Sequence, residues 1–103
     1  MEAHATLGMY SEIVHMAARV RIMIADDHPL VRSGLRVLLE REGEFEVVAE
    51  AADGYEAIDL AALHKPDVIL LDVGMPRLNG PDAALSISQK VPNARIDGQH
   101  ALG

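Results

Sequence analysis

The chain of 103 residues carries nine basic and sixteen acidic side chains, a formal net charge of −7, and half of its residues are hydrophobic. This length fits one small domain, and the charge excludes the basic face that nucleic acids and anionic membranes require. No cysteine is present, which excludes disulfide and thiol chemistry and favours a cytoplasmic location. No stretch approaches the ~20 apolar residues of a membrane span.

Residues 1–18 show only a weak hydrophobic pattern, and we expect a weakly structured extension there. From Arg19, apolar residues alternate with others as far as Ala25, which predicts a first strand. This strand ends in two consecutive acids, Asp26 and Asp27. The compact part of the chain is therefore expected to start near residue 19.

A first helix is predicted from Pro29 to about Arg41, capped by Asp27 or His28 and ended by Gly43. Its apolar residues cover more than one face: Leu30, Val31, Leu35, Val37, Leu38 and Leu39. A helix with such a wide apolar surface is expected to pack on a sheet with one side and on a neighbouring helix with the other.

A short second strand is predicted from Phe45 through the alanines that follow it. Asp53 and Glu56 have the spacing of a capping box, which opens a helix from Gly54 to about His64. Its expected inner stripe consists of Tyr55, Ile58, Ala61 and Ala62. The chain thus repeats the order of strand and helix.

Four consecutive apolar residues, Val68 to Leu71, are bounded by turn signals and predict a strand buried on both faces. Asp72 follows at the carboxyl end of this strand. After a loop rich in Gly, Pro and Asn, Pro81 suits the first turn of a third helix, which is expected to end near Lys90. The predicted inner residues of that helix are Ala84, Ile87, Ser88 and Val91.

The alternation of strands and helices predicts an α/β fold with a doubly wound parallel sheet. Residues 94–96 suit the start of a fourth strand, whereas residues 97–103 supply no apolar run to complete it. We therefore expect a partial domain over residues 19–96, with at most the start of a fourth strand. An unstructured tail is expected over residues 97–103.

Acidic residues end two strands that a doubly wound sheet would place side by side. Asp26 and Asp27 end the first strand and Asp72 ends the third, so their carboxylates are expected to meet at the topological switch point. Carboxylates gathered in this way repel one another unless a cation is bound, and Mg²⁺ prefers oxygen ligands of this kind. An Asp beside Mg²⁺ is also a competent nucleophile towards phosphorus. The pattern predicts an Mg²⁺-assisted phospho-acceptor.

Two stretches resemble the receiver domain of response regulators from two-component systems. They are residues 24–32, Ile-Ala-Asp-Asp-His-Pro-Leu-Val-Arg, and residues 71–80, Leu-Asp-Val-Gly-Met-Pro-Arg-Leu-Asn-Gly. The likeness is closest to members whose output is a helix-turn-helix DNA-binding domain. It implies a flavodoxin-like sheet of five parallel strands with helices on both faces, of which the chain matches only residues 19–96.

The resemblance also implies the roles of the site residues. Asp72 would be the phosphorylated residue, and Asp26, Asp27 and the backbone carbonyl of Gly74 would hold Mg²⁺ together with it. A histidine kinase would supply the phosphoryl group. The chain would then be a phospho-acceptor rather than an enzyme, with at most self-phosphorylation and self-dephosphorylation. His28 is a ligand candidate by its position, but the favoured role is that of a partly exposed turn residue.

The sequence departs from the family at the end of the fourth and fifth strands. The family has a Ser or Thr at the first place and a Lys at the second, and no residue here is matched to either. Three functions therefore stay open: phosphotransfer, a non-catalytic interaction stub, and, least favoured, an Mg²⁺-dependent hydrolase that uses Asp72.

The partners follow from the same expectations. Besides a histidine kinase, the chain is expected to associate with itself through the sheet edge where a fourth strand belongs and through the outer face of the first helix. Direct binding to nucleic acid or to a membrane is not expected from its charge and hydropathy.

Overall fold

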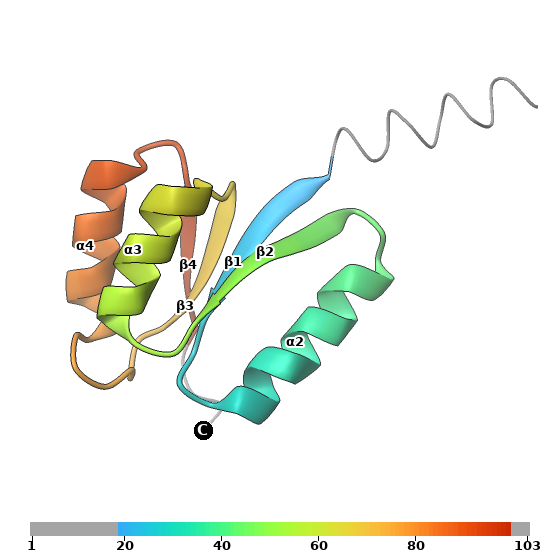
Figure 1. Ribbon diagram of the computed structural model, residues 1–103, viewed down its shortest axis with the longest axis horizontal. Helices are drawn as coiled ribbons and strands as arrows, with labels where there is room; N and C mark the ends of the chain where they lie inside the picture. Colours follow the sequence, from blue (N-terminus) through green and yellow to red (C-terminus); the bar gives the residue numbers. More distant parts are fainter. Residues whose placement is uncertain (1–18, 100–103) are drawn as a thin grey trace, which may run out of the picture.

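The computed structural model describes residues 19–99, which form a parallel sheet flanked by helices (Figure 1). Strand and helix alternate along this part of the chain, as predicted. The elements are β1 (Val20–Ala25), α2 (Pro29–Arg41), β2 (Phe45–Ala51), α3 (Gly54–His64), β3 (Val68–Asp72), α4 (Gly80–Lys90) and β4 (Arg95–Gln99). The expected extension over residues 1–18 lies outside the described residues, as do residues 100–103.

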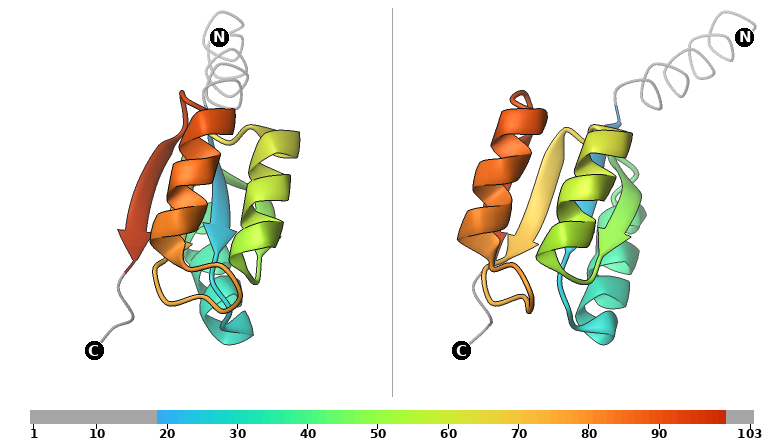
Figure 2. Two further views of the ribbon diagram at one scale, coloured as in Figure 1. Left: turned by 90° about the vertical axis from the view of Figure 1, so that its left-hand side faces the viewer. Right: turned by 60° about the vertical axis from the view of Figure 1, so that its left-hand side comes forward.

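The strand order is β2-β1-β3-β4, and every neighbouring pair is parallel. Helix α2 covers one face of the sheet, and α3 and α4 lie side by side on the other (Figure 2). The chain leaves β1 towards one edge of the sheet and later continues from β3 towards the other edge. This arrangement confirms the doubly wound α/β fold and places the switch point between β1 and β3.

Strand β4 is longer than the sequence predicted. It pairs with β3 over its whole length, from Val68 opposite Arg95 to Asp72 opposite Gln99. The expected boundary after Ile96, with an unstructured tail from residue 97, is therefore wrong for the first three residues of that tail. The reason is that β4 needs an apolar residue on one face only: Ile96 packs towards α3 and α4, and the pairing itself comes from backbone hydrogen bonds.

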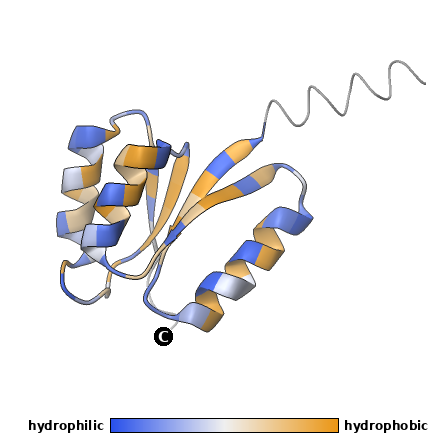
Figure 3. Cartoon of the chain, viewed as in Figure 1, coloured by the Kyte–Doolittle hydropathy of each residue, from blue (hydrophilic) through white to orange (hydrophobic). Residues whose placement is uncertain are grey.

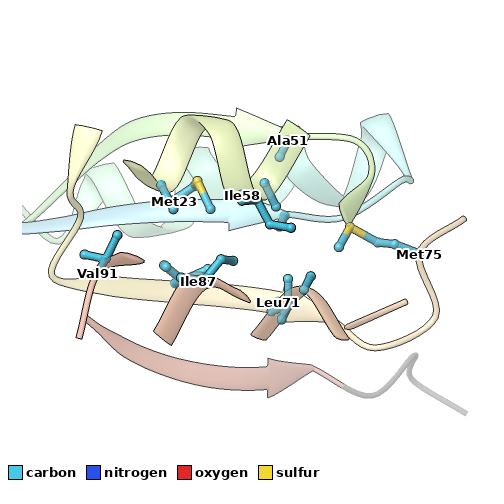
Figure 4. Packing of buried hydrophobic residues seen from close by; sticks show 12 residues of the cluster. Met23, Ala51, Ile58, Leu71, Met75, Ile87 and Val91 are labelled. Atoms are coloured by element: carbon cyan, nitrogen blue, oxygen red, sulfur yellow. The ribbon is translucent and has the colours of Figure 1, made fainter. Parts of the chain in front are cut away.

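The main core lies between the sheet and the pair α3 and α4 (Figure 4). Met23 from β1, Ile69 and Leu71 from β3, and Ile87 from α4 are its largest fully buried side chains on this side. Alanines fill the space around them, since aromatic residues are scarce. The apolar run of β3 is therefore buried because it forms an inner strand of the sheet, as its sequence predicted.

The inner faces of α3 and α4 were predicted only in part. Ile58, Ala61, Ile87 and Val91 are buried as expected. Tyr55 and Ser88 are exposed, and Ala57 and Ala83 are buried instead. Small residues occupy these positions because the two helices pack closely against the sheet and each other. The ring of Tyr55 instead lies outside, with the Arg77 guanidinium 5.5 Å from its centroid.

Helix α2 packs on the sheet with a narrow stripe and leaves the rest of its apolar surface open. Leu35 and Leu39 contact the smaller core formed by Ile22, Ile24 and Val47. On the outer face the apolar side chains are exposed, 88% for Leu30 and 59% for Leu38 among them. Hydrophobic residues recur along the whole length of α2, between hydrophilic ones (Figure 3). The predicted neighbouring helix on this face is not found among residues 19–99.

The edge expected to be open beside β3 is covered, because β4 lies there. The outer strand on that side is β4 itself, where Arg95 and Asp97 form an ion pair with 3.2 Å between Nε and Oδ1. Charged side chains on an edge strand discourage pairing with a second sheet. Within the described residues, no helix has the length and apolar composition that crossing a bilayer would need.

Candidate functional site

Three carboxylates meet at the carboxyl ends of β1 and β3, where the sequence predicted them. Asp26 directly follows β1, Asp72 is the last residue of β3, and these two strands pair. Both residues are almost fully buried, 5% and 3% exposed, and Asp27 beside them is half-buried. Ligand atoms of Asp26, Asp27, His28 and Asp72 all lie within 4.8 Å of one another. The switch point therefore holds a dense acidic cluster.

Asp26 is held on every side by its neighbours. Its backbone N–H donates to the carbonyl of Ala51 at 2.9 Å, and its own carbonyl accepts from Nη1 of Arg32 at 2.6 Å. Its Oδ1 accepts the backbone N–H of His28 at 2.8 Å. Arg32 also bonds Glu50 of β2 through Nε, at 3.3 Å. These contacts fix the carboxylate of Asp26 relative to both β1 and α2.

Asp72 is positioned by its strand and by the loop that follows it. Its Oδ1 accepts the backbone N–H of Gly74 at 3.0 Å, which turns the chain back over the carboxylate. The loop then closes on itself where the N–H of Gly80 donates to the carbonyl of Val73 at 3.2 Å. One carboxylate oxygen of Asp72 is thus oriented by the backbone, and Oδ2 lies on the side of the cluster.

Two glycines allow backbone segments of this loop to pack in close contact. A Cβ on Gly80 would lie 2.5 Å from Cα of Val73, and one on Gly54 would lie 2.3 Å from the carbonyl oxygen of Leu78. Only a residue without a side chain fits at either place. Gly80 is the first residue of helix α4. The physical requirement is close contact with the residue that follows Asp72.

His28 lies against the cluster, although the sequence favoured a turn role for it over a ligand role. It is the N-cap residue of α2, and its side chain is 60% exposed, in keeping with a turn residue. Its Nδ1 nevertheless lies 2.7 Å from Oδ1 of Asp26, 3.2 Å from Oδ1 of Asp27 and 3.9 Å from Oδ2 of Asp72. The hydrogen bond to Asp26, with the charge of Asp27, raises the pKa of His28 above its ordinary value.

The donor set fits a hard divalent cation. Oδ1 of Asp27 is buried and has no hydrogen-bond partner in the described part of the chain, so an acceptor is left free inside the cluster. Three carboxylates supply the oxygen ligands that Mg²⁺ prefers. An unpartnered buried carboxylate oxygen is costly, and a bound cation removes that cost.

The lysines of the chain and the end of β4 bear on the Lys and the Ser or Thr of the family. Lys65 caps the C-terminal end of α3, and Lys90 ends α4. Because these helices run antiparallel to the strands, both lysines lie near the amino ends of the strands, away from the acids at the carboxyl ends. Gln99 ends β4 with its backbone opposite Asp72, at the strand end where the family has a Ser or Thr and where no match was expected in this chain. The predicted metal contact of the Gly74 carbonyl stays a prediction.

Residues 22–96 match the response regulator receiver domain family, which corresponds to the sheet and helices described above. The chain belongs to this family of regulatory domains. Relatives include the transcriptional regulatory proteins DegU of Brevibacillus brevis and PdtaR of Mycobacterium tuberculosis. DegU is 42% identical over 78 residues, 76% of this chain and 33% of DegU. PdtaR is 51% identical over 70 residues, 68% of this chain and 34% of PdtaR.

The chain thus spans about a third of the length of these curated relatives. Both relatives are transcriptional regulatory proteins, and the family match confirms the predicted resemblance to response regulator receiver domains.

Solved structures agree with this assignment. The response regulator domain of CheB from Thermotoga maritima has a TM-score of 0.77 and 34% identity, covering 82% of this chain and 62% of that domain. The signal receiver domain of NarL from Mycobacterium tuberculosis has a TM-score of 0.76 and 38% identity, covering 82% and 68%. Both comparisons confirm the flavodoxin-like receiver fold.

Proposed function

We propose that this chain accepts a phosphoryl group on Asp72 in a two-component relay, with a histidine kinase as the donor and Mg²⁺ as the cofactor. The observation that carries the proposal is the position of Asp72, which is buried at the end of β3 beside Asp26 and Asp27. Asp26, Asp27 and Asp72 would hold the cation, with the carbonyl of Gly74. Bound Mg²⁺ would offset negative charge on the transferring group.

The residues of the chain have distinct parts in the transfer. A carboxylate oxygen of Asp72 attacks phosphorus and forms an acyl phosphate, while the bond from phosphorus to the donor nitrogen breaks and its electron pair stays on the donor imidazole. The N–H of Gly74, bonded to Oδ1, orients the carboxylate for this attack. Asp26, fixed by Arg32 and Ala51, keeps its carboxylate beside the acceptor.

A related structure supports the choice of cofactor. The CheY of Borrelia burgdorferi, 29% identical with a TM-score of 0.73, was crystallised as a complex with CheX, BeF₃ and Mg²⁺. Its fold and the acidic cluster of the present chain make the same ion the first candidate here.

The test is labelling of the purified chain by acetyl phosphate and by a histidine kinase, with and without Mg²⁺. We expect Mg²⁺-dependent labelling that Asp72→Asn abolishes, because the amide cannot form the acyl phosphate. Asp59→Asn, on the exposed side of α3, is the matched control and should label normally. Equal labelling of Asp72→Asn and the unmodified chain would show that the acceptor is another residue.

The second candidate is an interaction domain that binds partners without accepting phosphate. The sequence of β4 favours it, because the residue that ends this strand is Gln99, where the family has a Ser or Thr. If neither acetyl phosphate nor any kinase labels the folded chain in Mg²⁺, this second function replaces the first. No residue arrangement among residues 19–99 favours the hydrolase.

We also predict self-association through the outer face of α2. Leu30 and Leu38 are exposed there on one helix, and burying two such side chains is worth about 3–6 kcal/mol in total. Sedimentation velocity should show dimers or larger species at high concentration, and Leu30→Lys with Leu38→Lys should return the chain to monomer. A monomer at all concentrations, or association that survives both substitutions, would contradict this.

A further inference from the structure

We propose that His28 is a fourth ligand of the divalent cation at this site and that it shifts the site's preference from Mg²⁺ towards transition ions such as Co²⁺ and Zn²⁺. The inference deepens the metal site of the proposed function and rests on it. It concerns which ion the site selects, because three carboxylates without an imidazole would favour Mg²⁺ over Co²⁺ and Zn²⁺.

The geometry brings the imidazole nitrogen as close to the carboxylates as ligands of one ion lie to each other. With metal–ligand bonds of about 2.1 Å, ligand atoms around one ion are separated by about 3.0 Å when adjacent and about 4.2 Å when opposite. Nδ1 of His28 lies 2.7, 3.2 and 3.9 Å from oxygens of Asp26, Asp27 and Asp72. The four donor atoms therefore lie close enough together to bind one ion.

The backbone around His28 makes this placement a built feature. Its N–H is bonded to Oδ1 of Asp26, and Pro29 fixes the first turn of α2 directly after it. His28 has extended backbone angles, φ −99° and ψ 105°, as an N-cap residue does. The segment that carries the ring is thus fixed beside the acids, and the ring does not depend on a flexible loop to reach them.

The second observation is the buried Oδ1 of Asp27, which has no hydrogen-bond partner among the described residues although Nδ1 of His28 lies 3.2 Å away. An oxygen and a nitrogen at this separation, with the oxygen left unpaired, fit two donors aimed at a shared ion. Carboxylates alone suit Mg²⁺, Ca²⁺ and Mn²⁺, whereas imidazole suits Zn²⁺, Ni²⁺ and other borderline ions. Adding one imidazole to three carboxylates therefore favours the second group.

The test compares Co²⁺ and Mg²⁺ binding to the unmodified chain and to His28→Asn, without a phosphoryl donor. Asparagine is a good N-cap residue and replaces the nitrogen donor by an amide oxygen, so the variant keeps the start of α2 and becomes an all-oxygen site. Co²⁺ is followed by its visible absorption and both ions by calorimetry. His64→Gln, at the end of α3, is the matched control for histidines elsewhere.

We expect His28→Asn to weaken Co²⁺ binding by about tenfold or more while Mg²⁺ binding changes less than about threefold. Excess Mg²⁺ should displace the Co²⁺ whose binding is lost in His28→Asn. This competition would show that this Co²⁺ binds at the acidic cluster. In the Zn²⁺ complex, the ¹⁵N signal of Nδ1 of His28 should shift more than that of Nε2. His64→Gln should not change the absorption of the Co²⁺ that Mg²⁺ can displace.

The inference is overturned if His28→Asn changes the two affinities equally, or if it leaves Co²⁺ binding unchanged. In either case Mg²⁺ binding that Asp72→Asn removes would leave the proposed phospho-acceptor site standing. If the folded chain binds neither ion, the proposed site and this inference fail together. Labelling of Asp72 does not enter the measurement, so a chain that fails to accept phosphate can still support His28 as a ligand.

Discussion

In a chelator, Asp72→Asn is expected to raise the free energy of unfolding by about 1–3 kcal/mol. Asp72 is buried beside Asp26 and Asp27, with ligand atoms no more than 4.8 Å apart, and each such pair of like unit charges costs at least about 3.5 kcal/mol at an effective dielectric constant of 20. The nearby imidazole of His28 offsets part of that repulsion. An Asn at this position can still accept the N–H of Gly74, so the substitution removes charge without losing the loop contact.

Saturating Mg²⁺ should reduce or reverse this difference in stability. The ion binds only the folded chain, so at a concentration a hundred times its dissociation constant it adds about 2.7 kcal/mol to the unmodified protein and less to the variant. Urea unfolding in EDTA and in Mg²⁺ measures both effects. Asp59→Asn should change neither by more than about 0.5 kcal/mol. A loss of stability for Asp72→Asn in EDTA would show that the carboxylates are already compensated within the chain.

The sequence located the carboxylates of the site because strand ends are easy to recognise. The apolar run Val68 to Leu71 stops at Asp72, and the first strand stops at Asp26. Parallel strands present their carboxyl ends at one edge, so the meeting of these acids required only that β1 and β3 be neighbours. The pairing of β1 with β3 was the one tertiary fact assumed, and it was correct.

The sequence could not place side chains whose position depends on packing between elements. Tyr55 fits a helical stripe as well as Ala57 does, yet only the small residue fits between α3 and the sheet. Strand β4 was underestimated for a similar reason, since one inward residue, Ile96, suffices when the partner strand β3 is already in place. Hydrophobic periodicity predicts where helices and strands lie in the sequence, but it does not predict how closely they pack against one another.

The sequence favoured a turn role for His28 over a ligand role, because its contact with the acids arises from a local turn. The bond from its N–H to Asp26 is a short-range feature of residues two apart, and it brings the ring back over the acids. An acid followed two residues later by a histidine and then a proline is a signal for this arrangement. It becomes informative only when the strand end before it is known to face other carboxylates.

The loop after Asp72 has little freedom, because both of its ends are in close contact with backbone. Gly80 lies against Val73, so the two ends of the loop meet, and Leu78 within the loop lies against Gly54. Arg77, next to Leu78, has a positive φ of 72°. Arg77 also pairs with Asp53 at the start of α3, at 3.2 Å. The carboxylate of Asp72 therefore depends for its orientation on contacts that any added side chain would disturb.

Gly80→Ala and Gly34→Ala are accordingly expected to change stability in opposite directions. A Cβ at Gly80 would lie 2.5 Å from Cα of Val73, a backbone atom that cannot turn aside, so we expect a loss of about 1–3 kcal/mol. Gly34 lies within α2, and a methyl group added there would meet nothing within 4 Å. Alanine at this position should therefore add about 0.5–1 kcal/mol through helix propensity. Urea unfolding of both variants measures the difference.

The same pair of variants separates stability from function at the site. Gly80→Ala must displace Val73, and with it the backbone of Asp72 and Gly74, so amide signals of these residues should shift and Mg²⁺ should bind more weakly even well below the unfolding transition. Gly34→Ala should leave Mg²⁺ binding unchanged, because α2 meets the cluster only at its first turn. If Gly80→Ala binds Mg²⁺ as tightly as the unmodified chain, the orientation of Asp72 is set by β3 alone, and the glycine contact serves stability only.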